Sequence, residues 1–368
     1  MDADCVDKIT ASTGANDARL AELLCRALKM RASDIFVVPG APVMLKSEGK
    51  LLKLTEKRMS PADAHCFLKG IYRLAGDRAL DQLEQTGDDD FSFSLTDVSR
   101  FRCSAYRQRG TFAAILRVVP FGLPDAKMLN IPEAVMSLAE TRRGLVLVTG
   151  NAGSGKSTTL ACLIDRINRT RPEHIITIED PIEFLYPHRE SIVSQREVLH
   201  DTESFGKALR AALRQSPDVI LLGEMRDYET IHTALTAAET GHLLFSTLHT
   251  VGAAKTIDRL IDVFPAEQQQ QVRIQLSMVL RAVVSQQLIP NKKGGLIPAF
   301  EVMIVNRAIQ NMIREGKVHQ LDNVIFSGAS EGMRTMDSDL FRLYSQGFIT
   351  RDSAILHATQ PEALEKRV

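Results

Sequence analysis

The sequence predicts a two-domain α/β protein, in which a small α+β domain with an antiparallel sheet precedes a larger domain built on a parallel sheet. Short strands follow one another before residue 120, whereas strands and helices alternate from residue 145 onward. Prolines and a glycine cluster in residues 120–132, which is typical of a linker. The expected domains are therefore residues 1–119 and 133–368.

Local patterns predict the elements of the first domain. Apolar residues recur at helical spacing from Leu20 to Leu28. Ser60-Pro61 supplies a capping hydroxyl and then a proline at the first position of a second helix. The remaining elements are strands of an antiparallel sheet. They are expected at Ile35–Val38, Val43–Leu54 (with a turn at residues 47–50), Phe91–Leu95, Arg100–Tyr106 and Thr111–Val119.

In the second domain, the alternation of strands and helices implies parallel strands with crossover helices. From Ala266 onward the chain is expected to be mostly helical, apart from a strand near Leu296–Ile304. The alternating elements are strands at Leu145–Thr149, Ile175–Ile178, Val219–Leu222 and Leu243–Thr247, and helices at Thr158–Asn168, Glu203–Arg214 and Tyr228–Glu239.

Residues 150–157, GNAGSGKS, match the phosphate-binding pattern G-x-x-x-x-G-K-[ST] between a predicted strand and a predicted helix. The glycines let backbone N–H groups surround phosphate oxygens, Lys156 supplies a point charge, and the Ser157 hydroxyl ligates Mg²⁺. The sequence therefore predicts that a nucleoside triphosphate binds here with Mg²⁺. The candidate binding residues are Gly150, Asn151, Ala152, Gly153, Ser154, Gly155, Lys156, Ser157 and Thr158.

Carboxylates follow two of the predicted parallel strands. Residues 218–224 form an apolar strand that ends in Glu224, where a carboxylate reaches water on the Mg²⁺. The other strand is followed by Glu179, Asp180 and Glu183, at the sheet edge where ligands bind. Hydrolysis needs a base for the attacking water, and one of these acids could supply it. The alternatives are a core strand that happens to end in Gly-Glu and a solvated acidic loop.

Histidines and arginines give two further sets of candidates. His242 and His249 lie at the two ends of one strand, where imidazole could sense a γ-phosphate or could simply bond to the backbone, and their spacing argues against a metal. Arg102 and Arg117 belong to a group of arginines on first-domain strands. An arginine from outside the pocket can stabilise the charge on a transferring phosphoryl group. Ordinary surface arginines and a nucleic-acid stripe are the alternatives.

Composition excludes several classes of function. Lysine plus arginine balance aspartate plus glutamate at 45 each, and tryptophan is absent, so no direct nucleic-acid partner is expected. The five cysteines form no CxxC pair, which argues against zinc. No apolar run is long enough for a transmembrane helix, and the acidic start is unlike a signal peptide.

Taken together, these motifs resemble those of the secretion-superfamily ATPases, in particular the type IV pilus retraction (twitching motility) motors. GNAGSGKSTT (150–159) resembles their phosphate loop, ITIEDPIEF (176–184) their Asp box, DVILLGEMRD (218–227) their Walker B segment, and TGHLLFSTLHT (240–250) their His box. AIQNMIREGK (308–317) is similar to AIRNLIREGK, the stretch that marks the retraction branch. The resemblance covers nearly the whole chain.

The resemblance implies a PAS-like first domain, a RecA-like P-loop NTPase domain and a cytoplasmic ring of six subunits at the inner face of the membrane, where the pilus base lies. It implies ATP and Mg²⁺ as cofactors and an inner-membrane platform protein as partner, with other pilus ATPases as possible partners. The implied roles extend those argued above. Glu183 becomes the general base, Glu224 the Walker B acid on the metal, His242 and His249 the His-box residues, and Arg102 and Arg117 the charge-stabilising residues contributed by an adjacent subunit.

Three rival functions remain, together with departures from the family pattern. One is a generic RecA-like nucleic-acid motor, which DNA would stimulate. An extension or type II secretion ATPase usually carries an extra N-terminal domain and a four-cysteine zinc insertion, and a regulatory partner ring would bind nucleotide with little catalysis. Gln310 replaces the usual arginine of the retraction stretch, and Phe36 stands where a histidine is common. Asn151-Ala152 replaces Pro-Thr at variable loop positions.

Overall fold

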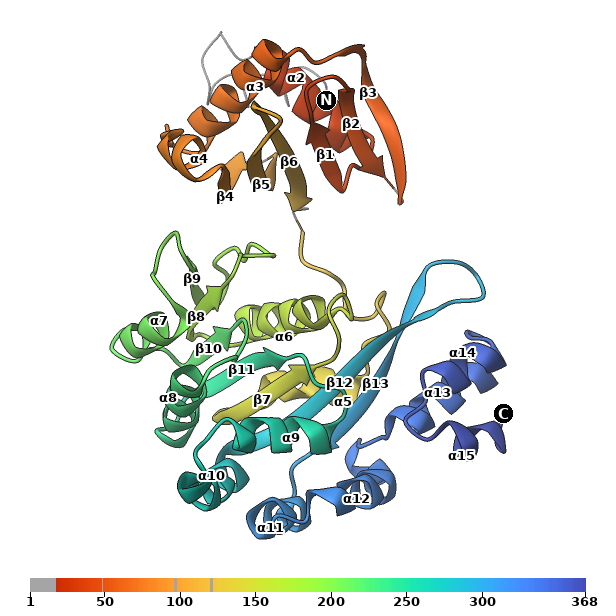
Figure 1. The fold of residues 1–368 in the computed structure, drawn as a ribbon. Coiled ribbons are helices and arrows are strands. Elements are labelled where there is room, and N and C mark those ends of the chain that lie inside the picture. Colours follow the sequence, from red (N-terminus) through yellow and green to blue (C-terminus); the bar gives the residue numbers. More distant parts are fainter. Residues whose placement is uncertain (1–17, 48, 96–97, 120–121) are drawn as a thin grey trace. The chain divides into compact units, whose positions relative to one another are not determined.

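The computed structural model describes residues 18–47, 49–95, 98–119 and 122–368, and the chain divides into two compact units, residues 1–122 and 123–368 (Figure 1). The division falls inside the segment that the sequence predicts as a linker. Among the described residues, no helix combines the length and the apolar character that crossing a membrane requires.

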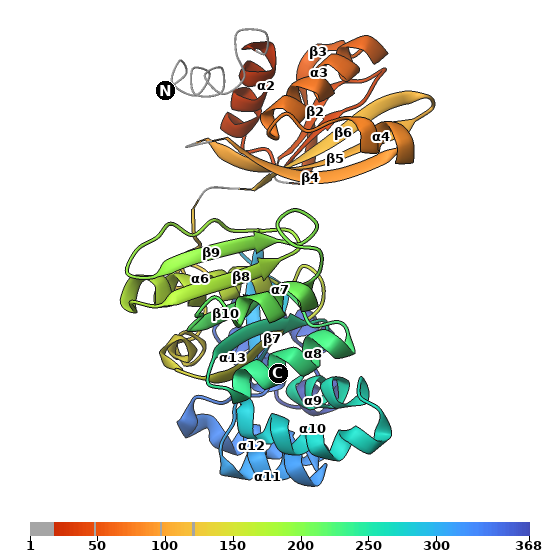
Figure 2. The ribbon, with the colours of Figure 1, turned by 90° about the vertical axis from the view of Figure 1, so that its left-hand side faces the viewer.

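The first unit contains a six-stranded antiparallel sheet with helices packed on it. Buried residues alternate with half-buried ones along β5, so that Phe101 and Cys103 face the core while Arg102 and Ser104 face the other side. Helix α3 packs against β6, and Figure 2 shows α2 and α3 on one face of the sheet. The sheet order is β3-β2-β1-β6-β5-β4. The elements are α2 (Ala18–Lys29), β1 (Asp34–Val37), β2 (Pro42–Ser47), β3 (Lys50–Arg58), α3 (Pro61–Leu74), α4 (Asp81–Thr86), β4 (Asp88–Leu95), β5 (Ser99–Gln108) and β6 (Thr111–Val119).

The second unit contains a seven-stranded sheet with helices on both faces. Along β7, Leu145 and Leu147 join the cluster that includes α8 and α9, whereas Val146 and Val148 join the cluster that includes α6. All pairs are parallel except β12–β13. The order is β13-β12-β7-β11-β10-β8-β9. The elements are α5 (Glu133–Met136), β7 (Gly144–Thr149), α6 (Lys156–Thr170), β8 (His174–Glu179), β9 (Ile192–Glu197), α7 (Phe205–Ala212), β10 (Val219–Leu222), α8 (Tyr228–Glu239), β11 (Leu243–Leu248), α9 (Ala253–Asp262), α10 (Ala266–Val279), β12 (Leu280–Pro290) and β13 (Leu296–Ile304).

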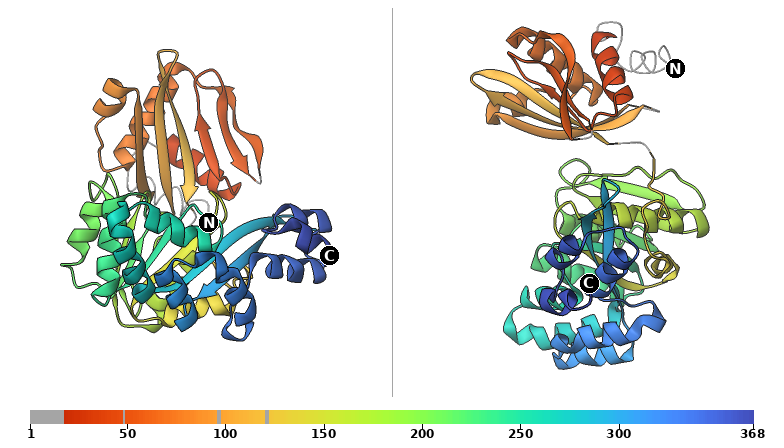
Figure 3. Two further views of the ribbon diagram at one scale, coloured as in Figure 1. Left: turned by 60° about the horizontal axis from the view of Figure 1, so that its bottom comes forward. Right: turned by 90° about the vertical axis from the view of Figure 1, so that its right-hand side faces the viewer.

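Five short helices complete the second unit. A separate cluster that includes Ile289, Ile297 and Leu340 joins the last three of them to the β12–β13 hairpin, beside which they lie in Figure 3. The helices are α11 (Arg307–Glu315), α12 (Leu321–Ser327), α13 (Met336–Ser345), α14 (Arg351–Leu356) and α15 (Pro361–Glu365).

The predicted α/β class is confirmed, but the expectation of a mostly helical chain after Ala266 is wrong in one important place. Residues 280–290 form β12, which pairs with β7 near the centre of the sheet. Residues 282–286 of this strand are all buried, and a buried run lacks the alternation that would separate a strand from a buried helix. The sequence analysis also missed α9 and the edge strand β9.

Candidate functional site

A pocket of about 290 Å³ lies at the carboxyl ends of the parallel strands of the second unit. Because β7, β8, β10 and β11 run in the same direction, the segments that follow them meet at this edge. The lining residues are Ala152, Gly153, Lys156, Ser157, Glu179, Asp180, Pro181, Glu183, Phe205, Gly223, Glu224, Arg226, Thr247 and His249.

The phosphate loop connects β7 to α6 through glycines that other residues could not replace. Gly150 has a φ of 141°, and a Cβ built on it would lie 2.3 Å from the carbonyl oxygen of Gln286. Gly155 has a φ of 88°, and its Cβ would lie 2.8 Å from Nε2 of Gln286. At Gly150 the loop can therefore lie against β12 only without a side chain, whereas at Gly155 the positive φ is the stronger constraint, because the Gln286 amide is the end of a flexible side chain. Gln286 is itself buried and accepts a hydrogen bond of 2.7 Å from Thr159 Oγ1.

Lys156, the first residue of α6, lies inside the loop. Its side chain donates to the carbonyl oxygens of Gly150 (2.8 Å) and Asn151 (2.9 Å). Burial lowers the pKa of Lys156, while the negative charges of Glu183 and Glu224 act in the opposite direction. Lys156 lines the same pocket as these two carboxylates, both of which were predicted from the sequence.

The Glu224 carboxylate follows β10 and is largely shielded from solvent. One of its oxygens lies 2.6 Å from Nε of Arg226 and 3.5 Å from Nε2 of His249. His249 follows β11, so a neighbouring strand end supplies it. The structure thus brings Glu224 and His249 together, as their positions at strand ends predict.

Glu179 and Glu183 differ strongly in exposure although both line the pocket. Glu179 is buried and accepts hydrogen bonds from Thr177 Oγ1 (2.7 Å) and Gln195 Nε2 (3.3 Å). Burial raises the pKa of Glu179 to about 7. The Glu183 side chain is exposed and free to approach a substrate. Asp180, between them, is also exposed.

His242 is not part of this pocket. It precedes β11, whereas His249 follows it, so the full length of the strand separates the two histidines. Its Nδ1 atom lies 3.0 Å from the carbonyl oxygen of Ala237 and 3.2 Å from Oγ1 of Thr240. Within this chain, His242 therefore bonds to its own neighbourhood, which is the alternative that the sequence analysis left open.

Arg102 and Arg117 belong to the first unit and face away from its core. They are directly opposed on β5 and β6, and Nε of Arg117 lies 3.0 Å from a carboxylate oxygen of Asp34. The Arg117 side chain remains 67% exposed. Two guanidinium groups thus emerge side by side on the face of the sheet opposite its buried core.

The pocket also contains residues that were not predicted as site residues, namely Pro181, Phe205, Gly223, Arg226 and Thr247. Arg226 could have been predicted from the sequence, since it lies two residues after Glu224 in the same segment. Thr247 lies near the end of β11, inside the segment 240–250, but no role was predicted for it, and Phe205 begins a helix that contributes no recognised motif. Only the folded sheet reveals that Phe205 is near the phosphate loop.

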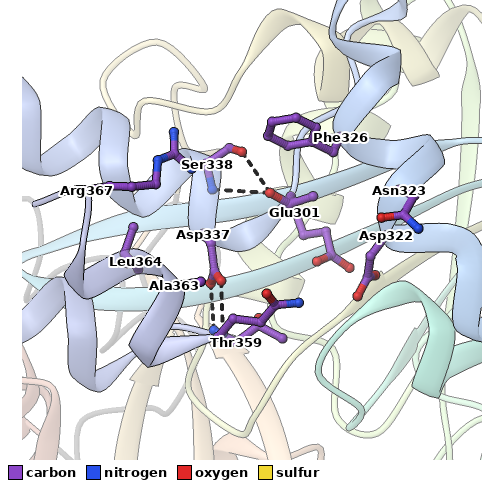
Figure 4. A pocket seen from close by; sticks show the side chains of 12 residues that line it. Glu301, Asp322, Asn323, Phe326, Asp337, Ser338, Thr359, Ala363, Leu364 and Arg367 are labelled. Atoms are coloured by element: carbon purple, nitrogen blue, oxygen red, sulfur yellow. Dashed lines mark hydrogen bonds between the residues drawn. The ribbon is translucent and has the colours of Figure 1, made fainter.

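A second hollow, of about 200 Å³, lies among the C-terminal helices and beside β13 (Figure 4). In the described part of the chain, its lining includes none of the predicted site residues. The buried Glu301 accepts hydrogen bonds from the backbone N–H groups of Ala253 (2.7 Å) and Met336 (3.4 Å), and burial raises its pKa. Asp337 accepts two more from Thr359 and Gln360. These carboxylates therefore join α9, α13 and the segment before α15.

The residues of the first pocket fit a nucleotide with Mg²⁺. The buried Ser154 Oγ has no hydrogen-bond partner among the described residues, and it lies in the turn that the two glycines open. Ser157 and Glu224 offer oxygen atoms, which are the ligands that Mg²⁺ prefers. With Lys156, the exposed Glu183, the largely shielded Glu224 and His249, the pocket can bind a triphosphate and assist the attack of water on it.

Known proteins resemble this chain in both sequence and fold. Residues 13–328 match the family model described as type II/IV secretion system protein. The chain is 46% identical to the type IV pilus retractation ATPase PilT of Pseudomonas aeruginosa over 93% of its length and 99% of that protein. It is 45% identical to a twitching motility protein of Neisseria gonorrhoeae, covering 87% of this chain and 85% of that one. A crystal structure of the pilus retraction motor PilT with bound ADP superposes with a TM-score of 0.88 at 47% identity, covering 94% of this chain and 98% of that one.

Proposed function

The chain belongs to the type II/IV secretion system protein family, and from that premise we propose that it is the ATP-hydrolysing motor of type IV pilus retraction. The single observation that carries this proposal is the convergence of Lys156, Ser157, Glu183 and Glu224 on one pocket. These residues come from three separate segments of the chain, and together they supply the groups that triphosphate hydrolysis needs. The similarity to retraction motors over nearly the whole chain supports the choice of biological role.

In the proposed reaction, a water oxygen attacks the γ-phosphorus of ATP as the bond to the bridging oxygen of ADP breaks. Lys156 and the loop N–H groups bind the phosphates and offset their growing charge. The exposed carboxylate of Glu183 accepts the proton of the attacking water. Glu224, already paired with Arg226 and close to His249, is assigned to the metal instead. When bound through Ser157 and water on Glu224, Mg²⁺ supplies positive charge to the β- and γ-phosphates.

We propose further that six copies form a cytoplasmic ring, peripheral to the inner face of the membrane at the pilus base. Arg102 and Arg117 of one subunit would complete the nucleotide site of the next, and His242 would act only in that assembled state. The linker over residues 120–132 would serve as the hinge between the two domains. The ring would act on an inner-membrane platform protein, with other pilus ATPases as further partners.

Turnover of the purified protein tests the chemistry. Lys156→Ala, Glu183→Gln and Glu224→Gln should each lower the rate of ATP hydrolysis by about a hundredfold or more. Lys207→Ala is the matched control, because Lys207 lies on the surface and pairs only with Glu203 in the described structure. Near-normal turnover in any of the three pocket variants would contradict the proposal.

Cell motility tests the biological role. In cells that lack their own retraction ATPase, the wild-type gene should restore twitching, and the Glu183→Gln gene should not. Light scattering of the purified protein with nucleotide should give the mass of a hexamer. If the wild-type gene instead restores pilus assembly in cells that lack the extension ATPase, the direction of motion assigned here is wrong.

A further inference from the structure

The segment that carries Glu183 has an unusual set of hydrogen bonds. It follows β8 and leads toward β9, and in the described residues no backbone–backbone hydrogen bond holds positions 181–186. A loop with so few internal bonds would leave a side chain at its centre poorly placed. Its position must therefore come from other groups.

Those groups are two side chains of β9. Gln195 donates from Nε2 to the carbonyl oxygen of Phe184 (2.8 Å) and accepts at Oε1 from the N–H of Tyr186 (2.9 Å). Its amide therefore pairs with the loop as a neighbouring strand would, through one donor and one acceptor. Glu197, two residues further on the same face of the strand, accepts at Oε2 from the N–H of Ile182 (3.0 Å).

Glu183 lies between the two points of attachment. The backbone is held at Ile182 on one side and at Phe184 on the other. The N–H of Glu183 itself points at Oε2 of Glu179, at a long distance of 3.5 Å. Gln195 also donates to the second oxygen of Glu179, at 3.3 Å. The buried ends of two parallel strands thus fix the backbone on which the exposed carboxylate stands.

The burial of the groups that hold the loop indicates that their hydrogen bonds persist in the folded protein. Glu197 is 4% exposed and Ile182 is 5% exposed, and Tyr186 packs in the core beside α6. A buried hydrogen bond to a carboxylate is costly to break, because the freed group loses its partner without gaining water. The loop ends are therefore anchored, while the side chain between them remains free to reach a substrate.

We propose that Gln195 and Glu197 are positioning residues that hold the backbone on either side of Glu183 and so place its carboxylate for water attack on the γ-phosphate. This inference rests on the proposed ATPase function. Neither residue lines the pocket, so neither touches the nucleotide. Their loss should therefore slow the chemical step and leave nucleotide binding almost unchanged.

The experiment compares kcat and KM for ATP, and the affinity for a fluorescent ADP analogue, in Gln195→Leu, Glu197→Leu and Glu197→Gln proteins. We expect kcat to fall about tenfold or more in both leucine variants, with KM and ADP affinity within about threefold of wild type. Glu197→Gln keeps an acceptor for the Ile182 N–H and should recover most of the loss. Ser194→Ala is the matched control, since it removes a 3.0 Å hydrogen bond from the same strand to His174, away from the loop.

A double-mutant comparison separates positioning from simple stabilisation. In a Glu183→Gln background, Gln195→Leu should change the residual rate less than twofold, because the group it positions is already gone. Three results would each overturn the inference. The rate losses of Glu183→Gln and Gln195→Leu could multiply in the double mutant, the ADP affinity of Gln195→Leu could fall together with its kcat, or its kcat could stay near wild type. If Gln195→Leu does not fold, Gln195→Glu carries the test, since it keeps the acceptor but repels Glu179. A Glu183→Gln protein as active as wild type would instead refute the proposed function.

Discussion

Arg102 and Arg117 stand directly opposite each other on two antiparallel strands of the first unit, and both project from the face that does not pack on its core. Like charges on directly opposed residues repel each other and destabilise a sheet, and the carboxylate of Asp34 forms an ion pair with Arg117. A surface ion pair with Arg117 this exposed contributes about 0–1 kcal/mol, so stability alone gives no reason to place two arginines together. In the proposed ring, the two arginines would instead meet the phosphates of a nucleotide bound to the adjacent subunit.

The first prediction concerns these arginines. Arg102→Ala and Arg117→Ala should each lower kcat by about tenfold to a thousandfold. In the proposed ring, each substitution removes a positive charge that would offset the negative charge of the transferring phosphoryl group. The melting temperature should change little. If the arginines act on an adjacent subunit, mixing Arg117→Ala and Lys156→Ala subunits should restore part of the activity, since some sites regain both groups. A mixture no more active than its components would show that the two residues serve the same subunit.

The second prediction concerns the magnesium dependence of turnover. Nε of Arg226 lies 2.6 Å from the Glu224 carboxylate, where it would compete with the proposed Mg²⁺ for the negative charge. Arg226→Ala should therefore lower the Mg²⁺ concentration for half-maximal hydrolysis about twofold to fivefold, whereas Glu224→Gln should raise it. The measurement is ATPase rate against free Mg²⁺ at saturating ATP. An increased magnesium requirement in Arg226→Ala would mean that the arginine helps to place Glu224 instead of competing for it.

The third prediction concerns the first glycine of the phosphate loop. Gly150→Ala places a methyl group 2.3 Å from the backbone of Gln286, where nothing flexible can move away. It should abolish ADP binding and lower stability by about 2 kcal/mol or more.

Gly241→Ala is the control for this third prediction. Gly241 also has a positive φ, of 107°, but nothing lies within 4 Å of a Cβ there. It should show only the cost of the backbone conformation, and ADP titration with thermal unfolding compares the two. Equal losses in the two variants would show that contact with β12 does not matter.

The fourth prediction concerns the pH dependence of stability. Burial raises the pKa of Glu179 from 4.5 to about 7. Between these values the unfolded chain has released the proton that the folded chain retains, so the free energy of unfolding falls as pH rises. Glu179→Gln removes this contribution and should gain stability relative to wild type as pH rises from about 4.5 to about 7. Thermal unfolding of the two proteins across this range measures it, and a constant difference in stability would contradict the assignment.

Local signals were sufficient for most of the fold. The loop at residues 150–157, the strand ends at Glu179 and Glu224, and the proline-rich segment near residue 120 all depend on residues close in sequence, and they predicted the α/β class and the nucleotide pocket. The edge strand β9 could not be found in this way, because its residues are half polar and its pairing partner is β8 alone. Its side chains nevertheless hold the loop of Glu183.

The amino-acid sequence by itself determined the phosphate loop, the acids that follow the parallel strands and the order of helices and strands that carries them, since each depends on residue type and short spacing. Only the tertiary structure decided which groups meet. It placed β12 against the loop glycines, brought Phe205 to the pocket, and paired Arg117 with Asp34. These outcomes depend on sheet order and burial, which join residues distant in the chain through contacts that no short pattern records.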